Sequence, residues 1–268
     1  MEAEEPLIRV RGLTKRYTRP GGRRGGGTVL AVADVDLTIA RGTDLALVGE
    51  SGSGKSTLAR CLARLEEPTG GGIWFEGADI LALHGRRLRP FRERVQLILQ
   101  DSATALDPRL RGADIISEPL QVLGRGNRRE RRRRALELME AVGLPAACAD
   151  RLPLELSGGQ RQRLAIARAL AVQPRLLILD EAFTGLDVSI QAQIASLLQD
   201  LRRRHGLTYL YISHDLPLMA RLADEMAIMF QGRIVEQGDT ARIIAEPAHP
   251  HTQALLAAVA SLPAAATP

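Results

Sequence analysis

The sequence has few cysteines, few aromatic residues and no long hydrophobic run. Two cysteines, Cys61 and Cys148, occur among 268 residues and form no Cys-x-x-Cys pair, so neither a disulfide framework nor a zinc site is expected. Aromatic residues make up only 3%, which disfavours a stacking platform for nucleic acid. No run of about 18 apolar residues is present, so no membrane-spanning helix is expected.

The bulk composition is that of an ordinary globular chain. An apolar fraction of 45% is enough for a real core. The acidic segment 1–6 lacks an apolar signal core, and we expect a soluble, cytosolic chain that is linked to any membrane through another protein. The net charge of +5 suits a nucleic-acid partner or an arginine-rich solvated surface, and the scarcity of aromatic residues favours the surface.

Residues 49–57 have the pattern of a phosphate-binding loop: Gly, four residues, then Gly-Lys-Ser. The apolar run 44–48 before the loop predicts a buried parallel strand, and 56–65 predicts a helix. This order places backbone N–H groups and a helix N-terminus against an anion. We expect Lys55 to reach the β- and γ-phosphates and Ser56 to hold Mg²⁺. The expected nucleotide contacts are Gly49, Glu50, Ser51, Gly52, Ser53, Gly54, Lys55, Ser56 and Thr57.

The apolar run that begins at residue 176 ends in two carboxylates, Asp180 and Glu181. A core strand has no structural use for adjacent acids, and at its carboxyl end they would face the phosphates. Asp180 suits a contact with Mg²⁺ or its water, and Glu181 suits polarising the attacking water. The alternative is an acid pair that caps the next helix.

Two more predicted strands, 95–100 and 208–215, carry polar residues at their ends. Gln100 ends the first strand, where an amide oxygen can bind a metal or a water. His214 lies near the end of the second strand and can contact a γ-phosphate, although a lone histidine is more often structural. We expect both to share a sheet edge with Glu181.

Residues 156–160 open a predicted helix over 161–171. Ser157 takes the N-cap position and the glycines leave backbone N–H groups exposed, which makes a second anion-binding helix N-terminus. Because the P-loop already serves one nucleotide, this second site suggests a nucleotide held by another subunit. A tight turn is the alternative. The residues are Leu156, Ser157, Gly158, Gly159 and Gln160.

Helices and turns are predicted from 101 to 156, as an insertion in an α/β core. The stretch 127–142 has apolar residues at helical spacing and an arginine run in its first half. A solvated helix face is the favoured interpretation of this run, and a nucleic-acid or lipid-surface patch is the alternative. The arginines are Arg128, Arg129, Arg131, Arg132, Arg133 and Arg134.

The N-terminal part alternates apolar and polar residues, which predicts strands at 7–12 and 29–39 around a glycine-rich loop at 19–27. Tyr17 stands just ahead of this loop, where its ring can stack on a base or cap the strand end. Further predictions are a strand at 73–77, a short basic helix at 86–94, and a hairpin formed by 227–230 and 233–236.

In this order the motifs resemble those of the nucleotide-binding subunit of an ATP-binding cassette transporter, from Tyr17 to about Thr240. Gln100 matches the Q-loop, 156–160 the signature, Asp180 and Glu181 the Walker B pair, and His214 the switch histidine. Residues 184–187, which end in Asp187, match the D-loop, and Tyr17 matches the adenine-stacking aromatic.

The resemblance implies a P-loop NTPase (RecA-like) α/β core with an antiparallel β subdomain and an inserted α-helical subdomain at about 102–164. The nucleotide-binding domain would cover 1–245 and a C-terminal extension 246–268. ATP would bind between two cassettes, with the P-loop of one facing Ser157 and Gly159 of the other. Ser56, Asp180 and Gln100 would hold Mg²⁺, and Glu181, His214, Lys55 and Gln100 would serve hydrolysis.

A narrower resemblance is to the importer ATPases for dipeptides, oligopeptides and nickel. It rests on the glycine-rich loop, on 100–109 and 187–193, and on the tail 249–256, in which His251 replaces a tyrosine. Ala182 and Phe183 depart from the family pattern after the Walker B pair, in a loop expected to face the partner. No cysteine follows Cys148, so neither an iron–sulfur cluster nor zinc is expected.

The implied partners are a second, paralogous cassette ATPase, two transmembrane permease subunits and, indirectly, an extracytoplasmic solute-binding protein. The implied location is the cytoplasmic face of the cell membrane, reached through the permeases. No nucleic acid is expected. The alternatives are a soluble cassette ATPase that acts on nucleic acid or the ribosome, and a cassette that serves an exporter.

Overall fold

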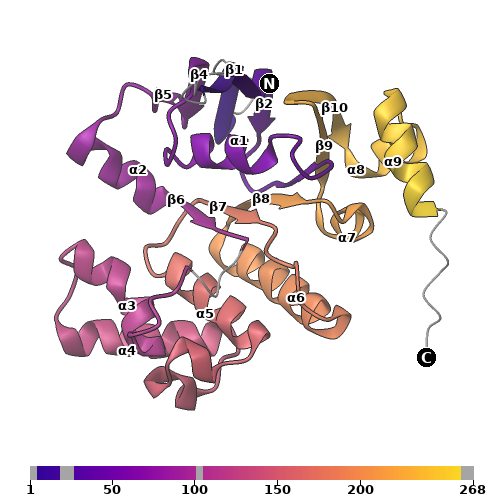
Figure 1. Ribbon diagram of the computed structural model, residues 1–268. Helices are drawn as coiled ribbons and strands as arrows, with labels where there is room; N and C mark the ends of the chain where they lie inside the picture. Colours follow the sequence, from indigo (N-terminus) through magenta and orange to yellow (C-terminus); the bar gives the residue numbers. More distant parts are fainter. Residues whose placement is uncertain (1–4, 19–26, 101–104, 261–268) are drawn as a thin grey trace. The chain divides into compact units, whose positions relative to one another are not determined.

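The computed structural model describes residues 5–18, 27–100 and 105–260 (Figure 1). Contacts divide the chain into two compact units, here called unit 1 (Met1–Leu88 with Tyr209–Pro268) and unit 2 (Arg89–Thr208). Residues 19–26 of the glycine-rich loop, 101–104 of the 100–109 motif and 261–268 of the C-terminal extension lie outside the described residues. The expected limits of the helical subdomain and the C-terminal extension stay predictions.

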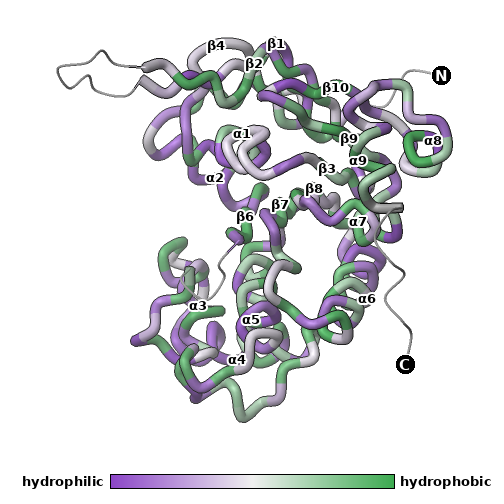
Figure 2. Tube along the Cα trace, turned by 45° about the vertical axis from the view of Figure 1, so that its right-hand side comes forward, coloured by the Kyte–Doolittle hydropathy of each residue, from purple (hydrophilic) through white to green (hydrophobic). Residues whose placement is uncertain are grey.

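The N-terminal strands of unit 1 form an antiparallel sheet in the order β2-β1-β4-β5. Hydrophobic and hydrophilic residues alternate along β1 and β2 (Figure 2), and the hydrophobic ones, such as Val10 and Leu37, are buried. Strand β1 continues beyond the predicted end at Gly12. The prediction stopped too early because bulges between residues 10 and 16 interrupt the alternation of apolar and polar residues. The strands are β1 (Ile8–Thr18), β2 (Thr28–Ile39), β4 (Gly70–Phe75) and β5 (Ala78–Asp79).

Strand β3 (Asp44–Val48) is the centre of a second group of strands in unit 1. It pairs in parallel with β8 (Thr208–Ser213) and β9 (Glu225–Phe230), and all of β3 and β8 is buried, as predicted for strands covered on both faces. Strand β10 (Arg233–Asp239) is antiparallel to β9, which confirms the predicted hairpin. The helices are α1 (Lys55–Leu62), α7 (Leu216–Leu222), α8 (Thr240–Ala245) and α9 (Pro250–Ala260).

Helix α9 is attached to the β9–β10 hairpin through the residues just before the helix and through His251 in its first turn. The Glu236 carboxylate in β10 accepts hydrogen bonds from the Ala248 N–H at 2.9 Å and the His249 N–H at 3.2 Å. Burial raises the pKa of Glu236, but these two bonds and the nearby Thr252 hydroxyl outweigh it, so the pKa lies below its usual value. The His251 ring stacks on Phe230 with centroids 3.9 Å apart.

Unit 2 combines a parallel strand pair with a cluster of helices. Strands β6 (Val95–Ile98) and β7 (Leu176–Asp180) pair with Ile98 beside Leu179, and helices α3, α4 and α5 pack against one another. None of the described helices has both the length and the apolar composition that a membrane span requires. The helices are α2 (Leu88–Arg94), α3 (Gly112–Val122), α4 (Arg128–Ala141), α5 (Gly158–Leu170) and α6 (Val188–His205).

Three of the six arginines in the run on α4 form ion pairs with nearby acids. Asn127 caps the helix through a capping box with Glu130, so the run begins in the first turn of a well-formed helix. Arg132 pairs with Asp150 at 2.9 Å, and Arg133 and Arg134 pair with Glu137 one turn later. This pattern agrees with a solvated helix face.

Candidate functional site

Glycines hold the loop between β3 and α1 against two neighbouring backbones. A Cβ atom on Gly49 would lie 2.2 Å from the carbonyl oxygen of Met229 in β9. A Cβ atom on Gly54 would lie 2.1 Å from the carbonyl oxygen of Ala31 in β2, and Gly54 has a φ of 110°. Side chains are therefore excluded at both positions. Gly52 has a φ of 82°, and no atom lies within 4 Å of a Cβ added there. Glycine is therefore required at this position only by the backbone conformation.

The Lys55 side chain lies inside this loop. Its ammonium donates hydrogen bonds of 2.7 Å to the carbonyl oxygens of Gly49 and Glu50, and the Ser53 Oγ lies 3.5 Å away. Lys55 is only 4% exposed. The loop thus closes around its own cation, which is a buried positive charge at the start of helix α1.

This arrangement fits the phosphates and metal of a magnesium nucleotide. Gly54 is the N-cap residue of α1 and has no side chain with which to cover the helix end. The positive end of the helix dipole and the Lys55 charge therefore coincide, and both favour an anion. Ser56, the second residue of the helix, adds a hydroxyl oxygen of the kind that Mg²⁺ binds.

The register of unit 1 brings His214 and the P-loop to the same sheet edge. Val48 of β3 pairs with Ser213 of β8, so the loop after β3 and His214 leave the sheet at neighbouring positions. His214 is exposed, whereas the next residue, Asp215, caps α7 by accepting a hydrogen bond from the Leu218 N–H at 2.9 Å. Capping therefore does not require the histidine.

Tyr17 lies near the end of β1, opposite Val29 of β2. Its hydroxyl donates a hydrogen bond to Glu66, a residue that the sequence motifs did not single out. Burial, and then this hydrogen bond, raise the pKa of the phenol. No sequence signal points to Glu66, because 49 positions separate it from Tyr17.

The acidic end of β7 lies in unit 2. Asp180 is 2% exposed, and Glu181 adopts the left-handed conformation with a φ of 50°, which is uncommon for a side chain of this kind. The Thr184 hydroxyl donates a hydrogen bond of 3.0 Å to the Glu181 carboxylate. This bond orients Glu181 just past the strand.

Gln100 follows β6 and is exposed. The strand ends at Ile98, earlier than predicted, and Ile98 pairs with Leu179 of β7. Gln100 and Glu181 therefore leave one edge of the strand pair in unit 2.

The signature segment in unit 2 starts helix α5. Ser157 accepts a hydrogen bond from the Gln160 N–H at 3.3 Å, and the Gln160 side chain accepts one from the Ser157 N–H at 3.0 Å. This capping box confirms the predicted N-cap. A Cβ atom on Gly159 would lie 2.9 Å from Ile190 of α6, so close packing also requires glycine there.

The D-loop precedes α6. Asp187 caps this helix by accepting a hydrogen bond from the Ile190 N–H at 2.9 Å. Ala182 and Phe183 are 4% and 5% exposed, so their side chains pack inside the chain. The expectation that these two residues alter a loop that faces a partner stays a prediction.

A family model for ABC transporters matches residues 32–184, which include the P-loop, the signature and the Walker B pair. The chain belongs to the ABC transporter family. Among the relatives of this family member is a probable peptide ABC transporter ATP-binding protein of Sinorhizobium fredii. It is 46% identical over 95% of this chain and 72% of the relative. A putative peptide import ATP-binding protein of Brucella ovis is 45% identical over 96% of this chain and 80% of the relative.

Solved ABC cassettes share the fold, which confirms the predicted P-loop NTPase class. A dimeric cassette in a post-hydrolysis state, bound to ADP and Pi, is similar with a TM-score of 0.78 and 30% identity over 87% of this chain and 99% of that one. CbiO1 of Clostridium perfringens, part of an ABC transporter complex, is similar with a TM-score of 0.77 and 27% identity over 91% and 92%. The predicted roles of individual site residues stay predictions.

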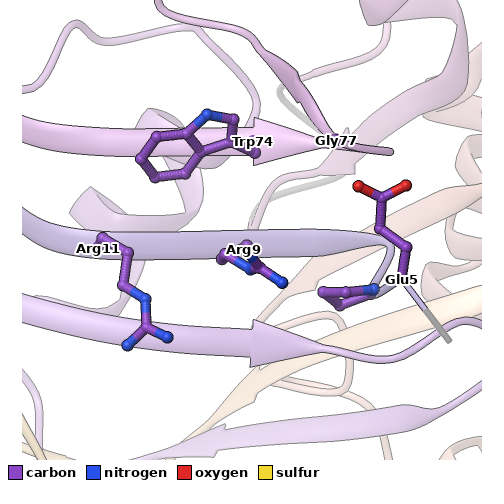
Figure 3. A pocket seen from close by; sticks show the side chains of 6 residues that line it. Glu5, Arg9, Arg11, Trp74 and Gly77 are labelled. Carbon is purple, nitrogen blue, oxygen red and sulfur yellow. The ribbon is translucent and has the colours of Figure 1, made fainter. Parts of the chain in front are cut away.

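A separate cavity of about 290 Å³ lies on the antiparallel sheet of this ABC protein (Figure 3). Trp74 lies beside Arg9 and Arg11 there, and the Trp74 indole covers the backbone of Gly72. Arg11 pairs with Asp36 at 3.6 Å. These contacts support the sheet, and we assign no ligand to the cavity.

Proposed function

We propose that this chain is the ATP-hydrolysing subunit of a membrane importer for peptides, nickel or a similar small solute. The observation that carries the proposal is the loop closed around Lys55 at the start of α1, in a chain that belongs to the ABC transporter family. The Brucella relative is named as a putative peptide import ATP-binding protein and the Sinorhizobium relative as a probable peptide ABC transporter ATP-binding protein. Both names support this solute class.

The loop residues bind the nucleotide and the strand-end residues prepare the water. Lys55 and the backbone N–H groups of 49–57 would hold the phosphates, and Ser56, Asp180 and Gln100 would provide oxygen atoms for Mg²⁺. Bound Mg²⁺ supplies charge neutralisation at the phosphates. Glu181, oriented by Thr184, accepts a proton from the attacking water, and exposed His214 donates a hydrogen bond to the terminal phosphate.

In a dimer of cassettes, each chain contributes one half of each of the two ATP sites. The N-terminus of α5, with Ser157 and Gly159, completes the pocket formed by the P-loop of another cassette, and Asp187 lies at that junction. The dimeric state of the solved ADP-bound cassette supports such an arrangement. The partner is a paralogous ATPase in our proposal, and closure of the pair drives two permease subunits that receive solute from an extracytoplasmic binding protein. The complex places this chain at the cytoplasmic face of the membrane.

The dependence of ATPase activity on protein concentration tests this proposal. The purified chain should bind MgATP while it hydrolyses ATP slowly at low concentration, because the signature half of the site comes from another chain. Activity per mole should rise with concentration, or upon addition of the paralogous cassette. Full activity per mole in samples shown by light scattering to be monomeric would contradict it.

A further inference from the structure

The Tyr17 hydroxyl lies in a cluster of charged and polar side chains within unit 1. It donates a hydrogen bond to Glu66, which lies in the turn between α1 and β4. The end of β1 is thus connected through one phenol to the segment that follows α1, the helix that the P-loop begins.

Glu66 is itself held in place. Its carboxylate pairs with Lys15 at 3.6 Å and with Arg60 at 3.7 Å, and its side chain is only 23% exposed. Its backbone N–H donates a hydrogen bond of 3.2 Å to the Arg60 carbonyl oxygen in the last turn of α1. The acceptor for the Tyr17 hydroxyl therefore has little freedom to move relative to α1.

Lys15 fixes the ring from a second direction. Its ammonium lies over the Tyr17 ring, 5.0 Å from the centroid, and donates a hydrogen bond of 2.7 Å to the Glu67 carbonyl oxygen. A cation over an aromatic face is held by the negative charge of that face. Lys15 thereby occupies one face of the ring, and a planar group can stack only on the other.

We propose that Glu66 is a positioning residue for the nucleotide base, acting through the Tyr17 hydroxyl. The proposal rests on the proposed function, in which the Tyr17 ring stacks on adenine. A ring that already has its orientation pays less conformational entropy when the base binds. The raised pKa of Tyr17, caused first by burial and then by Glu66, keeps the phenol protonated as a donor.

Binding of two ligands to the full chain separates positioning from fold support. Isothermal titration would compare MgATP with magnesium tripolyphosphate, which has the phosphates and no base. Glu66→Ala and Tyr17→Phe should each lower the affinity for MgATP about two- to tenfold, because this is the cost of ordering one side chain on binding. The double variant should bind MgATP no more weakly than the single variant with the lower affinity, since both substitutions remove the same hydrogen bond.

The control ligand and a neighbouring residue make the test specific. Tripolyphosphate affinity should be unchanged in all these variants, because the P-loop is untouched. Glu67→Ala is the matched control: this adjacent glutamate is 72% exposed, its carboxylate pairs with Arg64, and it should bind both ligands as the wild type does.

Distinct outcomes overturn the inference or its basis. An equal loss of affinity for MgATP and for tripolyphosphate in Glu66→Ala would mean that Glu66 only supports the fold. Unchanged MgATP affinity in Glu66→Ala, together with a loss in Tyr17→Ala, would overturn positioning and leave the proposed adenine contact intact. Unchanged affinity in Tyr17→Ala would refute that contact and the inference with it, and absence of MgATP binding by the wild type would refute the proposed function.

Discussion

Replacement of Gly49 by alanine tests whether the P-loop depends on close approach to β9. The added Cβ atom would lie 2.2 Å from the Met229 carbonyl oxygen and 2.9 Å from the Ser53 Oγ, whereas ordinary contacts begin at 3.4 Å. The serine can rotate away, but the carbonyl belongs to a paired strand. The loop must therefore move by roughly 1 Å away from β9, because a backbone carbonyl, unlike a side chain, cannot avoid the added atom by changing its rotamer.

The expected cost follows from that displacement. Overpacking in a well-packed site costs about 1–3 kcal/mol, and the upper end applies where backbone is the obstacle. At about 2–4 °C per kcal/mol, Gly49→Ala should lower the melting temperature by roughly 6–12 °C. A misplacement of about 1 Å can also cost roughly 100-fold in activity. We expect a comparable loss of ATPase activity.

Two glycines serve as controls in thermal unfolding and ATPase assays. Gly238 has an ordinary φ and no atom within 4 Å of an added Cβ, so Gly238→Ala should change stability by less than about 0.5 kcal/mol. Gly52→Ala adds strain from φ without a collision and should cost less than Gly49→Ala. A Gly49→Ala protein that melts and turns over like the Gly238→Ala control would refute the packing argument.

Three more predictions follow from the described contacts. Lys55→Met should weaken MgATP binding in titration and also lower stability by about 1–3 kcal/mol, since one buried and one partly buried loop carbonyl lose their donor; unchanged stability would contradict the hydrogen bonds seen. Gly159→Ala, which meets α6 at 2.9 Å, should cost about 1 kcal/mol in denaturant unfolding, whereas Gly158→Ala, with its nearest contact at 3.7 Å, should cost less. Glu236 has a lowered pKa, so its contribution to α9 attachment should be present above about pH 4.5 and lost as pH falls further, measured by hydrogen exchange of α9; Glu236→Gln should remove this pH dependence, and equal pH dependence in both proteins would refute it.

Elements with local signals could be predicted from the sequence. The strand 44–48, the P-loop and the hairpin turn at Gln231 and Gly232 each have a pattern that one conformation satisfies, and the structure has all three. The capping box at Ser157 could also be predicted, because its two partners, Ser157 and Gln160, are three residues apart.

Features that depend on contacts between distant residues could not be predicted. The hydrogen bond from Tyr17 to Glu66 and the left-handed conformation of Glu181 have no local pattern. Helix α6 (Val188–His205) was not predicted, although Ile194, Leu198 and Leu201 recur at helical spacing. Strand β6 ends before Gln100, since Leu99 and Gln100 are exposed rather than part of the buried run.

The comparison of Glu181→Gln with the wild type tests the central claim, that this chain hydrolyses ATP with Glu181 as the group that activates water. Phosphate release and MgATP affinity should be measured on both proteins, with the partner cassette present if the wild type requires it. The account predicts unchanged affinity and a fall in turnover of about 100-fold or more. Unchanged turnover in Glu181→Gln would contradict it.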